Sequence, residues 1–94
     1  MKDKIIKEID SLLSFFQEPK KWNGSPAPLI GWEIAVRSLK RLSKTKVNLV
    51  ISQSLNTLEA MEDVFRAWKQ SGFRTSFIMA VNQLKAIKRD LENL

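Results

Sequence analysis

Four cations recur along one stretch of the chain with the spacing of a helix face. Arg37, Lys40, Arg41 and Lys44 stand at positions i, i+3, i+4 and i+7, so in a helix all four side chains project from the same side. We call these four residues the basic stripe. Such a row can follow a phosphate backbone, where each neutralised phosphate releases a counterion. The alternative is an ordinary solvated helix face, on which cations near the C-terminus favour the helix dipole.

The net charge of the whole chain is concentrated around this stripe. Residues 20–46 contain seven cations and a single acid, Glu33, so their net charge of +6 equals that of the entire protein. Glu33 can offset the positive charge of Arg37 alone, which lies four residues further on. The other cations of the helix repel one another. Concentrated charge creates a local field that an anionic partner can find. The sequence therefore predicts an anionic partner, either nucleic acid or an acidic protein.

A second basic group lies in the loop before this helix. Lys20 and Lys21 are followed directly by Trp22, and an exposed tryptophan beside cations could stack on a nucleobase, a contact worth about 1–3 kcal/mol in single strands. The alternative, which is commoner for a loop tryptophan, is that Trp22 covers the end of the core. The candidate anion-binding residues are thus Lys20, Lys21, Trp22, Arg37, Lys40, Arg41 and Lys44.

Several kinds of site are excluded by composition. The chain has no cysteine and no histidine, so it lacks the usual zinc ligands, cysteine nucleophiles and the Ser-His catalytic pair. Glu59, Glu62 and Asp63 form an acidic cluster, but carboxylate di-metal bundles require a Glu-x-x-His motif. Glu62 is instead placed to pair with Arg66, four residues later. We therefore expect a protein that is not an enzyme, with no catalytic residue, metal or cofactor.

The apolar runs are short and are interrupted by charges. None approaches the roughly 20 residues of a membrane span, and the first residues, MKDKIIKEIDSLLSFF, do not resemble a signal peptide. The absence of cysteine fits a reducing compartment. We expect a soluble, cytoplasmic protein.

The elements that must position these residues are all helical. Apolar residues at helical spacing predict helices over residues 2–17, 28–43, 46–70 and 75–92. Four such helices joined by short loops are typical of a small antiparallel four-helix bundle. The whole chain, 1–94, is expected to form this single all-α domain.

One segment allows two interpretations. Val47, Leu49 and Ile51 alternate with polar residues, which is typical of a strand, yet the apolar residues up to Trp68 also share one helical face. A lone strand in a helical chain has no partner to pair with. We therefore predict one long helix over residues 46–70.

Some apolar residues exceed what a bundle requires. Ile30 and Ile34 lie off the inner stripe of their helix, and residues 77–81 are apolar on every side, so the starts of both helices are predicted to be buried. Leu49 and Ile78 are further surplus residues. If some of these four are exposed, they favour a second hypothesis, a protein-interaction module such as an adaptor, an inhibitor or a homo-oligomer. Contact with an anionic membrane surface is a third and weaker hypothesis.

Overall fold

The protein is an antiparallel helical bundle in a computed structural model that describes residues 2–71 and 77–94. Within these two ranges the chain forms five helices and no strand. The helices are α1 (Lys2–Gln17), α2 (Ala27–Thr45), α3 (Leu49–Glu59), α4 (Glu62–Ser71) and α5 (Phe77–Glu92).

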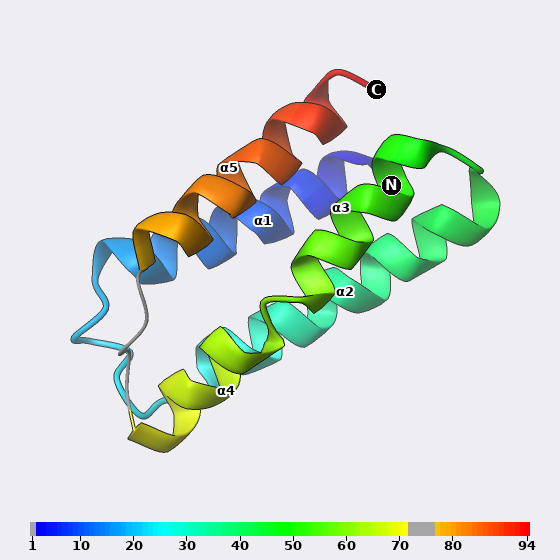
Figure 1. Cartoon of the computed structure of the whole chain (residues 1–94). Helices are drawn as coiled ribbons and strands as arrows, with labels where there is room; N and C mark the ends of the chain where they lie inside the picture. The colour runs from blue at the N-terminus through cyan, green and yellow to red at the C-terminus, as the bar shows by residue number, and fades with distance from the viewer. Residues whose placement is uncertain (1, 72–76) are drawn as a thin grey trace.

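The helices are arranged as four legs (Figure 1). α1 packs against α2 and α5, α2 packs against α3 and α4, and α5 returns against α3. α3 and α4 follow one another along α2 and together make one leg, so each leg runs antiparallel to its neighbours. The predicted all-α four-helix bundle is confirmed.

Most helix ends agree with the sequence pattern. α1 has the predicted bounds, and α2 begins one residue earlier and ends two residues later than predicted. The hydroxyl of Ser25 accepts a hydrogen bond from the N–H of Ala27 at 3.2 Å, which supports the start of α2. The predicted start of the fourth helix, at residue 75, lies outside the described residues. No helix in the described ranges is long and apolar enough to cross a membrane.

The single helix predicted over residues 46–70 is wrong, because the chain is interrupted twice there. Lys46 is extended, and helix α3 begins only at Leu49, where the side chain of Asn48 accepts a hydrogen bond from Val50 N–H at 2.8 Å. Of the alternating residues, Leu49 and Ile51 therefore lie in a helix, and Val47 lies before it and not in a strand. The second interruption separates α3 from α4 at Ala60.

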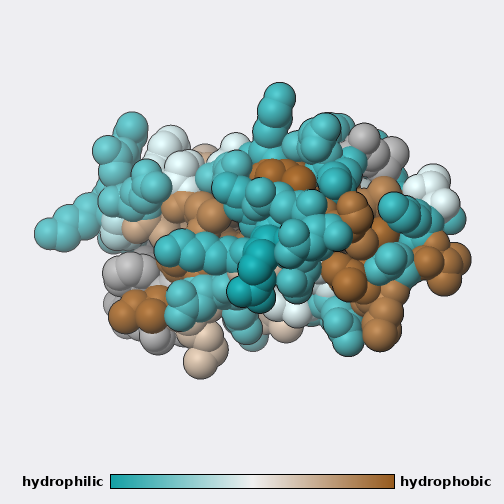
Figure 2. Space-filling model, turned by 90° about the horizontal axis from the view of Figure 1, so that it is seen from above, coloured by the Kyte–Doolittle hydropathy of each residue, from teal (hydrophilic) through white to brown (hydrophobic). Residues whose placement is uncertain are grey.

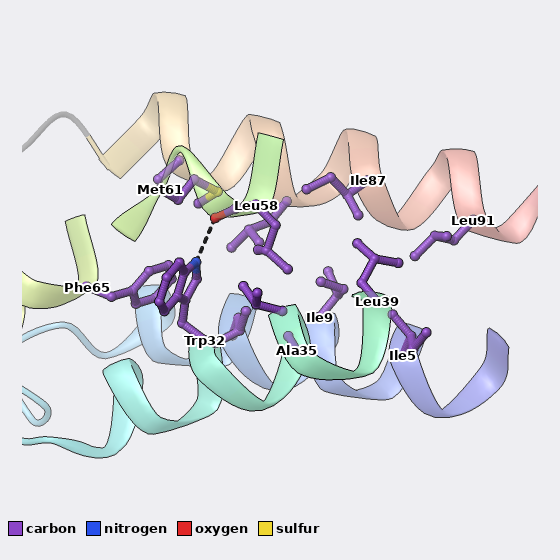
Figure 3. Close-up of a cluster of buried hydrophobic side chains, with 14 of the residues drawn as sticks. Ile5, Ile9, Trp32, Ala35, Leu39, Leu58, Met61, Phe65, Ile87 and Leu91 are labelled. Atoms are coloured by element: carbon purple, nitrogen blue, oxygen red, sulfur yellow. Dashed lines mark hydrogen bonds between the residues drawn. The ribbon is translucent and has the colours of Figure 1, made fainter. Parts of the chain in front are cut away.

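This second break has a cause in the tertiary structure. In an unbroken helix the carbonyl of Leu58 would accept the N–H of Glu62. Here it accepts the indole N–H of Trp32 at 2.6 Å and the backbone N–H of Met61 at 3.1 Å (Figure 3). The indole of α2 thus satisfies a terminal carbonyl of α3. Glu62 and Asp63 then open α4, where acids favour the positive end of the helix dipole.

Inward-facing residues from the four legs meet in a single core. Figure 3 shows Ile5 and Ile9 of α1 and Leu39 of α2 pointing toward Ile87 and Leu91 of α5. At the other end, the ring of Phe65 stacks at 6.2 Å on both Trp32 and Trp68. All eight side chains are at most 6% exposed, so they account for much of the hydrophobic stabilisation of the bundle. Among the described residues, the buried side chains of this apolar core are Ile5, Ile9, Leu12, Phe16, Leu29, Trp32, Ala35, Val36, Leu39, Leu42, Ile51, Leu58, Met61, Phe65, Trp68, Ala80, Leu84, Ile87 and Leu91.

The predicted burial of two helix starts is wrong. Ile30 and Ile34 remain 52% and 42% exposed, and Ile78 and Met79 remain 66% and 65% exposed. Among the described residues, each leg packs mainly against two others, so its outward side is not covered and apolar residues there stay at the surface. The view from above shows brown patches on a mainly hydrophilic face, several of them toward the end where α2 turns into α3 (Figure 2).

Helices α1 and α2 approach closely at Gly31, which leads to a stability prediction. A Cβ atom there would lie 3.2 Å from Leu12 Cδ2 and 3.3 Å from Phe15 Cε2. We expect Gly31→Ala to change the free energy of unfolding by less than about 1 kcal/mol, because a gain of up to about 1 kcal/mol in helix propensity offsets these contacts. Gly31→Val forces further carbons into the same gap and should destabilise the protein by about 1–3 kcal/mol.

Urea denaturation of both variants measures the difference. Glu33→Val is the matched control, since it places the same side chain at an exposed position of α2 and isolates the propensity cost of a β-branched residue. Equal stability of the alanine and valine variants at position 31 would show that α1 and α2 do not approach closely there.

Candidate anion-binding surface

The basic stripe lies on the outward side of α2. Arg37, Lys40, Arg41 and Lys44 are all exposed, and the inward side of the helix is occupied by Trp32, Ala35, Val36, Leu39 and Leu42. None of the four cations has an acidic oxygen within 4.0 Å among the residues that the structure describes. Their charge is therefore available to a partner.

One side of the stripe borders a groove between α2 and the α3–α4 leg. The groove encloses about 380 Å³. Its walls are formed by Trp32, Glu33, Val36, Arg37, Lys40, Glu59, Glu62 and Arg66. Three acids and three cations thus share its lining, and Arg66 is paired to Glu62 at 2.9 Å, as the spacing predicted.

This groove divides the basic stripe into two parts. Arg37 and Lys40 line the groove and have Glu59 and Glu62 as neighbours across it, whereas Arg41 and Lys44 lie outside it. The sequence interpretation assigned Glu33 as the only nearby acid. It missed the two glutamates because their position beside the stripe depends on how the α3–α4 leg lies along α2, which no local pattern encodes.

The second group of candidate residues occupies the loop between α1 and α2. Lys20 and Lys21 are exposed, and Trp22 is half-buried, with its ring edge-on to that of Phe15 at 4.9 Å between centroids. The ammonium of Lys21 lies 5.2 Å from the centre of the Trp22 ring, within the range of a cation–π contact. Trp22 therefore packs at the end of the core, and part of its ring remains exposed.

The loop is also tied to the end of α4. The N–H of Gly24 donates to the carbonyl of Trp68 at 3.0 Å, and Gly24 adopts a φ of +77°, a conformation that side chains other than glycine disfavour. Lys20 to Trp22 are thereby held at the end of the bundle where α2 begins (Figure 1). Lys44 lies about 25 Å further along α2 at 1.5 Å per residue. The structure does not bring the two groups of candidate residues into one compact site.

Ile30 and Ile34 extend the stripe toward the start of α2. At 100° per residue they fall on the same side of the helix as Arg37, Arg41 and Lys44. We call these five residues the outer row. Its first half is apolar and its second half is basic, and sequence reasoning had assigned the first half to the core.

Two cations of α5 have acidic neighbours. Lys88 on α5 pairs with Asp10 on α1 at 2.8 Å. The hydrogen bond that Lys88 donates to Asp10 raises the pKa of Lys88 above its ordinary value, because a nearby acceptor of opposite charge favours the charged amine. Arg89 lies 3.7 Å from Asp90. The α5 cations thus form a patch that is diluted by acids, unlike the basic stripe.

A second cleft, between α3 and α5, has a different lining. Its walls are Gln53, Ser54, Asn56, Thr57, Gln83, Ala86, Ile87 and Asp90, mostly amides and hydroxyls with one carboxylate. Within the described ranges, no three acidic side chains are grouped as a metal site would require. The outward side of α2 therefore remains the strongest candidate for a functional surface. No protein-family model matches the chain, and no curated protein or solved structure is significantly similar to it.

Proposed function

We propose that this protein is a non-enzymatic binding module that recognises an anionic macromolecule through the outward face of α2. The observation that carries the proposal is the row of four exposed cations with no ion-pair partner within the described residues. No acid occurs between Glu33 and Glu59 along the chain, so the field near Arg41 and Lys44 is uniformly positive. The lack of cysteine supports a cytoplasmic location.

Nucleic acid is the first candidate partner, bound mainly through its phosphates. Contacts from the basic stripe, with a secondary contribution from Lys20, Lys21 and Trp22, would position the strand without reading its bases. The half-buried Trp22 ring offers at most a partial stacking surface.

The test is a titration of a fluorescently labelled oligonucleotide at two salt concentrations. If four phosphates are neutralised, raising the salt from about 50 to about 200 mM should weaken binding about 50-fold for a single strand and about 150-fold for a duplex. Zwitterionic lipid vesicles, which carry no net charge, serve as the negative control. Affinity that does not change with salt would contradict the proposal.

An acidic protein is the second candidate partner. The exposure of Ile30 and Ile34 beside the cations favours it, because aliphatic side chains contribute to protein interfaces and have no role in phosphate contact. A homo-oligomer would use the same apolar residues, and its mass in sedimentation would distinguish it from the monomer.

A further inference from the structure

The outer row has the spacing of a helix–helix contact. Its five members, Ile30, Ile34, Arg37, Arg41 and Lys44, are separated by four, three, four and three residues. This alternation is the repeat by which one α-helix packs along another. At 100° per residue the five side chains fall within an arc of about 80° and extend about 21 Å along α2.

No described element covers this row. α2 packs against α1 on one side and against α3 and α4 on the other, and all five side chains of the row are exposed. Ile30 and Ile34 are 52% and 42% exposed, so about half of each remains available to bury against a partner. The row is therefore a helix face with the pattern of an interface and no partner.

The chemistry of the row specifies what would complement it. Two isoleucines would pack against apolar side chains, and three cations would pair with carboxylates. Carboxylates are stabilised near the N-terminus of a helix, where the dipole is positive. Because the cations lie toward the C-terminus of α2, the acidic half of the partner faces them when the two helices run antiparallel.

Nucleic acid fits this surface less completely. Its phosphates could contact only the basic half, and Glu33, Glu59 and Glu62 border that half at the groove. Phosphate contact would leave Ile30 and Ile34 exposed, whereas an amphipathic helix buries them. The apolar half thus discriminates between the two classes of partner.

We infer that the outer row of α2 binds an acidic amphipathic helix of a partner protein, aligned antiparallel to α2. The inference rests on the proposed function, since it names the partner of the same anion-binding surface. Two apolar side chains of that helix cover Ile30 and Ile34, and acidic side chains pair with Arg37, Arg41 and Lys44.

A synthetic helical peptide provides the probe. It carries three glutamates in its first half and two leucines in its second half, at the alternating spacing of the row and with alanine and glutamine elsewhere. Fluorescence anisotropy of the labelled peptide should show saturable binding to the full chain. A peptide with the two halves exchanged, and therefore the same composition, should bind about tenfold more weakly.

Two variants separate the halves of the row. Ile30→Ser with Ile34→Ser should weaken peptide binding about tenfold and leave oligonucleotide binding unchanged. The control is the double variant Ile78→Ser with Met79→Ser, which changes two exposed apolar residues of α5. It should not alter peptide binding. Charge reversal at Arg37, Arg41 and Lys44 to Glu should abolish peptide binding, and a peptide with lysines in place of its glutamates should restore it. Circular dichroism confirms that each variant remains folded.

The outcomes distinguish the inference from the proposed function. The helix inference is overturned if the double isoleucine variant binds the peptide as tightly as the unchanged protein does. It is also overturned if the peptide with exchanged halves binds as tightly as the original peptide. An oligonucleotide that binds tenfold more tightly than the peptide, through the basic stripe, overturns it as well and identifies nucleic acid as the partner. If neither the peptide nor the oligonucleotide binds, the proposed function itself is wrong.

Discussion

Replacing Trp32 with alanine is expected to destabilise the protein by about 3–5 kcal/mol, the usual cost of removing a large buried aromatic side chain. Trp32 is 6% exposed and stacks on Phe65. It also donates its indole N–H to the carbonyl of Leu58, where α3 ends. The alanine variant loses the packing and the hydrogen bond together, which is why its effect should exceed that of the Gly31 variants.

Trp32→Phe separates these two contributions. Phenylalanine keeps an aromatic ring against Phe65 but leaves the Leu58 carbonyl without the indole, so we expect a loss of about 1–3 kcal/mol in urea denaturation. Trp22→Phe is the matched control, because Trp22 is half-buried and its ring makes a T-shaped contact with that of Phe15. That control should cost less than about 1 kcal/mol. Equal losses for the two phenylalanine variants would show that the indole hydrogen bond does not stabilise the end of α3.

Reversal of all four cations of the basic stripe should lower oligonucleotide affinity at least 100-fold at low salt. Each of Arg37, Lys40, Arg41 and Lys44 that becomes glutamate removes a phosphate contact and adds a repulsive charge. The variant should keep its fold, since all four side chains are exposed and surface charges contribute little to stability. The salt dependence of any residual binding should also flatten.

A second quadruple variant controls for net charge. Lys4, Lys7, Lys85 and Arg89 are exposed on α1 and α5, and their reversal to glutamate changes the charge of the chain by the same amount. It should weaken binding only a few fold, through the long-range field. If both quadruple variants lose affinity equally, the basic stripe is not a localised site and only the overall charge matters.

The two halves of the outer row would then have different roles. The basic half attracts any anionic macromolecule and sets the salt dependence of the encounter. The apolar half, Ile30 and Ile34, adds contact area that only a partner with its own apolar side chains can use. Variants of the isoleucines therefore test selectivity, and variants of the cations test attraction.

Periodicity in the sequence predicted much of the fold. The bounds of α1 and the position of α2 follow from apolar residues at helical spacing, from Pro19 after α1 and from Ser25 before α2. These signals are local, because each depends on residues a few positions apart. The exposure of the basic stripe was predictable for the same reason, since it lies opposite the inner stripe of its own helix.

Other features depend on residues that are distant in sequence. The break between α3 and α4 has no proline or glycine to signal it, and it coincides with a hydrogen bond from Trp32 to Leu58, 26 positions later. Ser38 on α2 is buried and donates to Glu8 on α1 at 3.0 Å, although neither residue belongs to an apolar pattern. Such contacts form only when the legs have packed.

By itself, the sequence determined that the protein is an all-α bundle with a basic surface on its second helix, because helix periodicity and charge clustering are local properties of the chain. Only the tertiary structure decided which surface surrounds that stripe. The packing of each leg against two neighbours left Ile30 and Ile34 exposed in line with the cations, and the α3–α4 leg placed Glu59 and Glu62 at the side of the stripe. Both features depend on which faces of the helices pack against another helix. Packing between residues distant in sequence determines this, and no short stretch of residues does.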